Sequence, residues 1–395
     1  MIGIDSGLFS RREVLRGSVI SSGLWITGFE KIHWTNLFST QNVDPFREGT
    51  QLGTIDFSDE GTPPMDQASG IELDGRLFTD LSKITSANSI TPTETFYVRT
   101  RASKLLDTTS PWSVQLGSLA EKPVSIQFQE LDRMARPMGL HLMECAGNSR
   151  SAHFGMLSVA DWHGIPMLEI LEQAQLNQMG RVVVVGFDRY STESGSSIPG
   201  ASWIFTLSEL KSSGAFLATR MNGQLLSLDH GAPVRLVVPG WYGCTCIKWV
   251  QRISLVAEDG AATPQMREYA SRTMQTGIPL LARDFKPAVI DPAAMPVRVE
   301  RWLVGGKIRL RVAGLQWGGS LAADGLEIQF NPNEPYLPVT NTQIGSKGCW
   351  NFWSQVWTPQ KPGKYIIRLR LKARDAVTRR LDSGYYARSV EILEI

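Results

Sequence analysis

The segment His141–Arg150 reads HLMECAGNSR, and its single thiol decides how the rest of the chain is interpreted. The apolar run His141–Met143 predicts the end of a β-strand. The small residues after Cys145 predict a tight turn in which Gly147 and Asn148 can adopt positive φ. Cys145 is therefore expected at the tip of a strand. A thiolate there suits a soft metal ion or a nucleophilic attack, although a free cysteine is as often a small buried hydrophobe.

Length and composition set the limits within which this thiol must act. The chain has 395 residues, 42% hydrophobic and 20% charged, which is typical of a globular protein with two domains. The formal net charge of +2 indicates no polyanionic partner, so nucleic acid is not expected. The four cysteines, at 145, 244, 246 and 349, form no CxxC pair and no disulfide framework. A zinc ribbon, an iron–sulfur site and covalent haem are therefore not expected.

The N-terminal residues 1–49 are interpreted as an export signal and linker. The string SRREVLRG (Ser10–Gly17) places twin arginines before a short apolar stretch, as in a twin-arginine signal. That stretch is about a dozen residues long, shorter than the roughly 20 that span a bilayer. We therefore expect a periplasmic protein, exported in the folded state and tethered to the membrane if the signal is not cleaved.

The remaining sequence predicts two domains of different character. Within residues 50–275, strand-like strings (PVSIQFQEL, RVVVVGF, VRLVVPG) alternate with short helical ones (LEILEQAQ, LSELKSS), which indicates an α+β domain. Within residues 285–395, the strings KIRLRVAG, LEIQF, KYIIRLRLKARD and ARSVEILEI are separated by turn residues and lack helical periodicity. This second region is expected to be an all-β sandwich.

Three strings in order along the chain resemble the sulfite oxidase family of molybdenum enzymes. They are Asp74–Arg101, the string MECAGNSR, and Met221–Ser254, which contains DHGAPVR and PGWYGCTCIKW. The resemblance covers most of the chain after about residue 70. It implies a molybdopterin-binding α+β domain followed by an immunoglobulin-like dimerisation domain, with molybdenum and molybdopterin as cofactors. In that reading Cys145 is the sulfur ligand of the metal.

The resemblance also assigns roles to individual side chains. Arg99 in FYVRTR and Arg150 fall on the arginines of an anion pocket, which suits the planar fork of guanidinium donors. Tyr269 in MREYAS falls on the active-site tyrosine, whose phenol can donate a hydrogen bond. The cofactor-binding set implied by the family is Tyr97, Arg99, Asp188, His230, Arg235, Cys246, Ile247 and Lys248.

The function implied is oxidation of sulfite or a related small sulfur oxyanion. We find no haem-binding string, so the electrons are expected to pass to a separate acceptor, a c-type cytochrome. Two alternatives within the class stay open, a sulfane dehydrogenase subunit and a sulfoxide reductase, and so does a secreted two-domain binding protein without enzymatic activity. The string GCWNFWSQVW (Gly348–Trp357) carries more apolar area than one sandwich edge is expected to hide, which favours a homodimer.

Overall fold

The computed structural model describes residues 46–117, 124–176, 180–319, 325–346, 348–372 and 377–394. The chain divides into two units, Met1–Arg47 and Glu48–Ile395, and the second contains all the strands and helices described below. The expected export signal at Ser10–Gly17 lies outside the described residues. Within the described residues, no helix combines the length and the apolar character that a membrane span requires.

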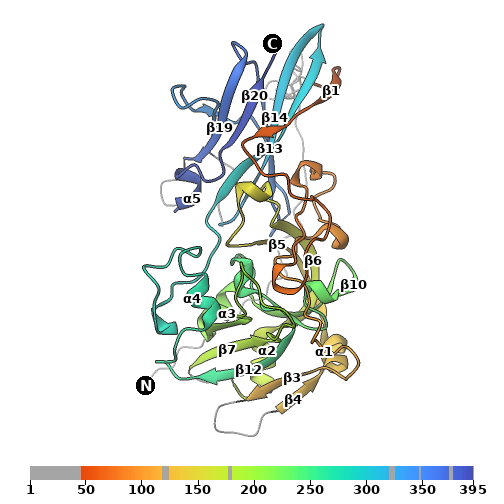
Figure 1. Ribbon diagram of the computed structural model, residues 1–395, viewed down its shortest axis with the longest axis vertical. Coiled ribbons are helices and arrows are strands. Elements are labelled where there is room, and N and C mark those ends of the chain that lie inside the picture. The colour runs from red at the N-terminus through yellow and green to blue at the C-terminus, as the bar shows by residue number, and fades with distance from the viewer. Residues whose placement is uncertain are drawn as a thin grey trace, which may run out of the picture. The chain divides into compact units, whose positions relative to one another are not determined.

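Two five-stranded sheets build the cofactor-binding part of the second unit (Figure 1). One sheet has the order β4-β3-β12-β7-β8, in which β12 runs parallel to β3 and antiparallel to β7. The other has the order β10-β9-β6-β5, with β11 also paired to β9. The strands are β3 (Ser113–Gly117), β4 (Val124–Gln127), β5 (Arg136–Glu144), β6 (Leu157–Pro166), β7 (Arg181–Gly186), β8 (Ser202–Thr206), β9 (Phe216–Met221), β10 (Gln224–Leu225), β11 (Arg235–Val237) and β12 (Val250–Val256).

Short helices connect these strands: α1 (Phe128–Met134), α2 (Met167–Gln173), α3 (Leu207–Ser213) and α4 (Pro264–Glu268). The helix expected from LSELKSS is confirmed as α3, because Thr206 and Glu209 form a capping box at its start. The string PVSIQFQEL is only partly a strand. It leaves β4 after Gln127 and turns into α1, where Phe128 and Leu131 lie on one helical face and pack into the core.

The C-terminal region forms two further five-stranded sheets, so the predicted immunoglobulin-like sandwich is confirmed. Their orders are β1-β13-β14-β18-β17 and β16-β15-β19-β20-β2. The elements are β1 (Thr50–Ile55), β2 (Phe57–Ser58), β13 (Ala293–Val304), β14 (Lys307–Trp317), β15 (Leu326–Gln329), β16 (Leu337–Pro338), β17 (Asn341–Gln343), β18 (Asn351–Trp357), β19 (Gly363–Leu371), α5 (Arg379–Asp382) and β20 (Arg388–Ile392).

The first two strands of the unit belong to this sandwich, which corrects the expected start of the cofactor-binding domain at residue 50. Strand β1 pairs with β13, joining Thr50 to Leu303, and β2 pairs with β20, joining Phe57 to Val390. In Figure 1, β1 lies beside β13 and β14, far from β3 and β4, which follow β2 in the sequence. The backbone hydrogen bonds of residues 50–58 are thus satisfied by the C-terminal sheets.

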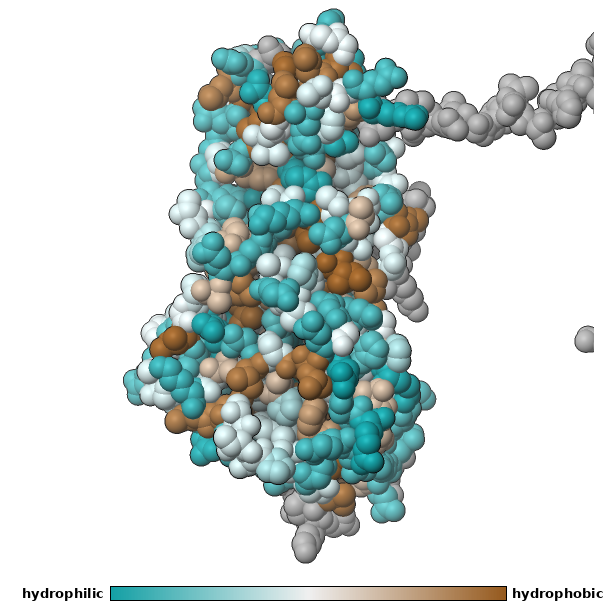
Figure 2. Space-filling model, turned by 90° about the vertical axis from the view of Figure 1, so that its right-hand side faces the viewer, coloured by the Kyte–Doolittle hydropathy of each residue, from teal (hydrophilic) through white to brown (hydrophobic). Residues whose placement is uncertain are grey.

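The tryptophans of Gly348–Trp357 are buried within the chain, so the predicted surplus of exposed apolar area is wrong. Trp350, Trp353 and Trp357 are 0%, 3% and 6% exposed. Trp357 stacks on the ring of Phe330 at 4.6 Å between centroids. On the face shown in Figure 2, apolar side chains form small patches divided by polar ones. These tryptophans therefore do not support a homodimer, and the expectation of a homodimer rests on the family resemblance alone.

Gly314 tests how tightly the sandwich is packed. A Cβ at this position would lie 2.2 Å from the ring of Trp353 and 2.3 Å from the carbonyl oxygen of Met295. We expect Gly314→Ala to lower the free energy of unfolding by about 1–3 kcal/mol, because neither neighbour has room to withdraw. Gly195→Ala, where no atom lies within 4 Å, is the control and should change it by less than about 0.5 kcal/mol. Urea unfolding of both variants measures the difference, and equal midpoints would contradict tight packing.

Candidate active site

A cavity of about 840 Å³, open to solvent, lies where β5, the segment after β7 and the β11–β12 connection meet. It gathers every residue expected at the site except Arg150 and His230. The expected residues that line it are Tyr97, Arg99, Cys145, Asp188, Arg235, Cys246, Ile247, Lys248 and Tyr269.

Cys145 follows the last residue of β5, so the prediction of a thiol at a strand tip is confirmed. Its backbone N–H donates to Met156 at 3.0 Å, and its carbonyl accepts from Asn148 at 2.9 Å. The side-chain oxygen of Asn148 accepts the Met156 N–H at 3.0 Å, which closes the turn. The thiol is 3% exposed and lines the cavity.

The turn does not use the backbone conformation that its sequence suggested. Neither Gly147 nor Asn148 has positive φ; the left-handed residues come later, at His153 and Phe154. The Asn148 side chain, rather than a left-handed glycine, closes the turn. Gly147 instead donates its N–H toward the Cys145 sulfur at 3.4 Å.

The environment of the thiol is both dry and positive. Burial raises the pKa of Cys145, while Arg99 and the Gly147 N–H favour the thiolate and oppose that rise. Arg272 acts in the same direction as Arg99, whereas the charge of the neighbouring Glu144 raises the pKa of Cys145 further. A metal ion binds cysteine as thiolate, so metal binding would release the proton that burial retains.

The C-terminal sandwich holds the strand that carries this thiol. Glu144, the residue before Cys145, is 0% exposed. Its carboxylate accepts the indole N–H of Trp317 and the hydroxyl of Tyr386, each at 2.8 Å. Both donors come from the sandwich, so the two domains share one buried polar network.

A second set of contacts from the sandwich grips the turn itself. Arg380, in α5, donates to the carbonyl of Ala146 at 2.7 Å and to that of Arg272 at 2.8 Å. The hydroxyl of Tyr385 donates to the carbonyl of Asn148. The turn after Cys145 is therefore fixed by side chains more than 200 residues away in the sequence.

Two basic side chains line the cavity, Arg235, which is buried, and Lys248, which is half-buried. Arg235 is 6% exposed; it donates to the carbonyl of His230 at 3.2 Å, and its Nε has no partner among the described residues. The Lys248 ammonium donates to the carbonyl of Asp229 at 2.9 Å and to that of Thr100. Burial lowers the pKa of both groups. Neither forms an ion pair with a carboxylate of the described residues, so the pair is suited to an anionic ligand group.

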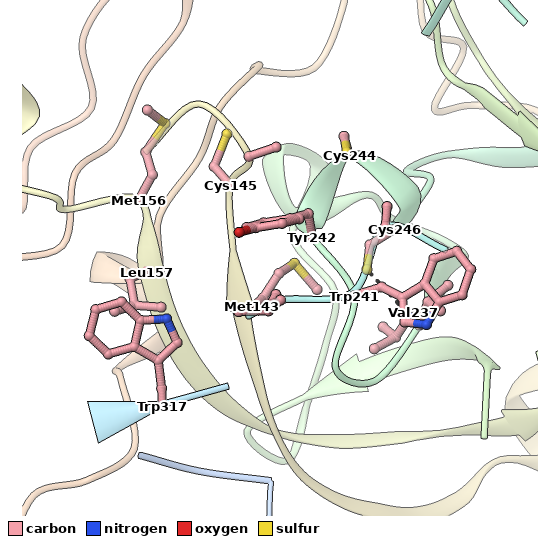
Figure 3. Close-up of a cluster of buried hydrophobic side chains, with 14 of the residues drawn as sticks. Met143, Cys145, Met156, Leu157, Val237, Trp241, Tyr242, Cys244, Cys246 and Trp317 are labelled. Atoms are coloured by element: carbon pink, nitrogen blue, oxygen red, sulfur yellow. Dashed lines mark hydrogen bonds between the residues drawn. The ribbon is translucent and has the colours of Figure 1, made fainter. Parts of the chain in front are cut away.

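The turn between β11 and β12 brings two further cysteines to the cavity. Cys244 and Cys246 lie on the 3₁₀ turn Gly243–Thr245 and its end, and Figure 3 shows them across from Cys145 at the tip of β5. Gly243 is required because a Cβ there would lie 2.4 Å from the hydroxyl of Tyr97. The backbone of this turn can thus approach the side chain of Tyr97 closely.

The phenol of Tyr269 stays neutral at physiological pH. Burial, with a contribution from Cys145, raises the pKa of Tyr269 to about 12. The Arg272 guanidinium lies 5.1 Å from the centre of its ring. Tyr269 can therefore donate, but not carry charge, at the edge of the cavity. Burial also raises the pKa of Asp188, while the backbone N–H groups of Gly200 and Ala201 oppose that rise.

His230 and Arg150 lie outside the cavity lining, and their expected ligand roles stay predictions. Nε2 of His230 lies 3.0 Å from the carbonyl of Phe96, and Nδ1 lies 2.7 Å from the Ser227 hydroxyl. Burial lowers the pKa of His230 to about 4, so the ring is neutral and ties two segments together. Arg150 donates to the carbonyl of Ala387 at 2.6 Å, in the sandwich.

Sequence reasoning missed several residues around the cavity. The lining also contains Tyr190, Cys244, Gln265 and Glu268, and Arg76 and Arg272 lie close enough to act on its charged groups. Only Arg76 and Cys244 fall inside strings that carry the resemblance, and nothing in those strings marks a role for either. Contacts between distant segments bring these residues to the site.

Comparisons with known proteins find similarity over the part of the chain that contains Cys145, Arg235 and Lys248. The family described as "Oxidoreductase molybdopterin binding domain" matches residues 102–263. Sulfite oxidase of Arabidopsis thaliana is 29% identical over 295 residues, covering 65% of this chain and 72% of that protein. Human mitochondrial sulfite oxidase is 26% identical over 330 residues, which is 77% of this chain and 58% of its own length. The NAD(P)H nitrate reductase of Hordeum vulgare is 27% identical, over 69% of this chain and 35% of that protein.

The chain spans 58% of the length of the human and macaque sulfite oxidases that it matches. Among solved structures, the crystal structure of the sulfane dehydrogenase SoxCD from Paracoccus pantotrophus superposes with a TM-score of 0.61. It is 17% identical and covers 92% of this chain and 97% of that chain. This similarity shows that the two chains share the same fold over both domains, including the sandwich.

The unpaired cations predict how a phosphate-bearing pterin is retained. The double variant Arg235→Ala and Lys248→Ala should purify with at least about 10-fold less molybdopterin per chain, since each lost charge-assisted contact weakens binding by about 1.5–3 kcal/mol. The matched control is Lys211→Ala with Arg252→Ala, which removes two exposed cations of the same domain. Fluorescence of the released, oxidised pterin gives the content. Equal content in both double variants would assign Arg235 and Lys248 a structural role.

Proposed function

We propose that this chain, which belongs to the sulfite oxidase family of molybdopterin oxidoreductases, oxidises a small sulfur oxyanion, with sulfite as its first substrate. One observation carries the proposal. Arg99 lines the same cavity as the Cys145 thiol, and its Nη1 is buried without a hydrogen-bond partner among the described residues. A buried guanidinium with a free donor costs free energy unless an anion occupies the site.

The residues of the cavity fit a molybdopterin. Cys145 would provide the one protein sulfur ligand, and the orphaned donor of Arg235 together with Lys248 would hold the phosphate. Cys246 and Ile247 line the same cavity and would contact the pterin. When bound, the molybdenum supplies a centre that exchanges oxygen and takes up two electrons.

The protein side chains then have defined tasks. Oxidation of sulfite consumes water and yields sulfate, two protons and two electrons. Arg99 orients the anion and balances its charge in a cavity where burial strengthens the attraction. Tyr269, neutral because its pKa is about 12, donates to an oxygen of the substrate. Glu144 and Arg380 keep the thiol in place from outside the cavity.

Three further parts of the proposal concern the protein's surroundings. We propose a c-type cytochrome as the separate electron acceptor, because the chain offers no haem-binding string. We propose export to the periplasm through the twin arginines Arg11 and Arg12. We also propose a homodimer through the immunoglobulin-like domain, which light scattering at micromolar concentration tests against the single-chain mass of 43.8 kDa.

Substrate choice is tested with purified holoprotein and ferricyanide as an artificial acceptor. Sulfite-dependent reduction of ferricyanide is the expected result. Turnover of thiosulfate or a protein-bound sulfane without sulfite activity would favour the sulfane dehydrogenase alternative. Reduction of a neutral sulfoxide, or of nitrate as in the nitrate reductase relatives, with reduced methyl viologen as electron donor in place of ferricyanide, would overturn the proposed direction of the reaction.

Cys145 is expected to be the metal ligand. Cys145→Ser should lower sulfite turnover by at least about 100-fold, because a hydroxyl is a poor ligand for a soft metal. The thermal midpoint should stay close to that of the natural protein, since the change is nearly isosteric. Cys349→Ser, a half-buried thiol whose sulfur faces the carbonyl of Ser89, is the control. Activity retained in Cys145→Ser would end the metal–thiolate assignment.

Arg99 is expected to bind the substrate anion. Arg99→Gln should raise the KM for sulfite by about 10-fold or more, which corresponds to about 1.4 kcal/mol or more of lost charge-assisted binding. Arg150→Gln removes the arginine that the structure bonds to Ala387, and it should raise KM much less. An equal rise in both variants would return Arg150 to the anion pocket. Steady-state kinetics at constant ionic strength separates these results.

A further inference from the structure

Every second residue of the segment Glu72–Arg76 forms hydrogen bonds with a serine-rich loop, residues 191–197. Glu72 opens the segment, and its carboxylate is 1% exposed. It accepts the Ser191 hydroxyl at 2.9 Å, and from Thr192 both the N–H at 3.0 Å and the hydroxyl at 2.7 Å. Burial would raise the pKa of Glu72, but these hydrogen bonds and one from the Lys104 N–H outweigh it and lower the pKa to about 2. Glu72 is therefore ionised at neutral pH and fixes the start of the loop.

Asp74 and Arg76 continue the same pattern along the loop. Asp74 accepts the hydroxyls of Ser194 at 2.5 Å and Ser196 at 2.7 Å. Arg76 donates through Nη2 to the Ser197 hydroxyl at 3.3 Å. Its Nη1 is held by backbone carbonyls, among them that of Arg99 at 2.7 Å. These contacts fix the position of the loop relative to Arg76.

Ser197 connects the contacts of Glu72, Asp74 and Arg76 with Arg99, the proposed anion-binding residue. Its hydroxyl oxygen also accepts Nη2 of Arg99 at 2.9 Å, so both lone pairs face guanidinium groups. The contact fixes the orientation of Arg99, whose other terminal nitrogen remains buried and unpartnered in the described structure. The next residues of the loop, Ile198 and Pro199, line the cavity. The loop therefore forms part of the cavity wall and also orients the side chain of Arg99.

Arg76 and Arg99 form a pair of like charges. Neither makes an ion pair with a carboxylate of the described residues, and a neutral hydroxyl lies between them. Burial, and then the charge of Arg99, lower the pKa of Arg76 to about 10 against the opposing charge of Asp74, so Arg76 remains cationic at neutral pH. Two neighbouring cations repel each other, and an anion bound beside them removes that repulsion. The attraction grows with the charge of the anion, which favours dianions over monoanions.

We propose that Arg76 and Ser197, acting through Arg99, form a charge-matched oxyanion unit that selects doubly charged oxyanions over singly charged ones. The unit deepens the proposed function and rests on it, because it places the substrate anion of that function at Arg99. Arg76 supplies a second positive charge next to Arg99. Ser197 is the positioning residue that orients Arg99 and its free donor.

The test measures binding of inorganic sulfate and of nitrate to the oxidised, molybdopterin-loaded full chain by calorimetry. Sulfate cannot be oxidised further, so binding is measured without turnover, and the pterin already occupies its own phosphate site. Arg76→Gln should raise the Kd for sulfate by about 10-fold and that for nitrate by only about 3-fold, because a dianion loses twice the Coulomb energy. Arg189→Gln, an exposed cation next to the same loop, should leave both constants unchanged.

Ser197→Ala should raise the sulfate Kd by about 3- to 10-fold, and Ser197→Thr should restore it, since threonine retains the hydroxyl. Ser196→Ala removes the neighbouring hydroxyl, which binds Asp74 and neither arginine, and is the matched control.

Equal loss of sulfate and nitrate affinity in Arg76→Gln would overturn the charge-matched unit, as would unchanged affinity in Ser197→Ala. Loss of molybdopterin from Arg76→Gln with unchanged sulfate affinity would assign the unit to the cofactor's phosphate and overturn it too. If the sulfate and nitrate affinities change as expected but the natural protein does not oxidise sulfite, the proposed function is refuted and the charge-matched unit is still supported.

Discussion

Glu144 is a carboxylate without access to water, and the position of the Cys145 thiol depends on how that carboxylate is satisfied. Its two hydrogen-bond donors, Trp317 and Tyr386, both belong to the immunoglobulin-like sandwich. A buried carboxylate that loses its partners is strongly destabilising, so neither domain can shift without disturbing the other. The sandwich is therefore part of the thiol's support, whatever role it also has in assembly. Arg380 reinforces this arrangement at the Ala146 carbonyl.

The basic side chains of the cavity lack ion-pair partners within the described structure, although the carboxylates of Asp188, Asp229 and Glu268 also line the cavity. Arg99, Arg235 and Lys248 line it, and none forms an ion pair with a carboxylate of the described residues. Such groups weaken the folded state when they stand alone, because burial removes their hydration without replacing it. Anionic ligands restore that loss. The residues that destabilise the empty fold are thus those that bind cofactor and substrate, a conflict that functional sites commonly retain.

The sequence predicted the chemistry of the site better than its geometry. Cys145, Arg99 and Lys248 lie in strings whose order alone carries the resemblance, so they could be named without a structure. Ser197 could not, because its contact with Arg76 joins a loop to a segment 121 residues earlier. His230 also lies in an intact motif, but its ring nitrogens contact Phe96 and Ser227, so its expected ligand role stays a prediction. Strands were recognisable from their composition, whereas nothing in residues 50–58 indicates that they pair with β13 and β20.

The pairing of β1 and β2 with the C-terminal sheets makes the cofactor-binding domain an insertion within the sandwich. The chain starts the sandwich, leaves it for the whole cofactor-binding domain and then returns to complete it. Closing so long a loop is slow, because its ends must meet before the edge strands gain any hydrogen bonds. During synthesis the β1 strand must wait until β13 has emerged. Once the sandwich closes, both ends of the inserted domain are anchored in it, so a pterin that enters afterwards meets a domain tethered at both ends.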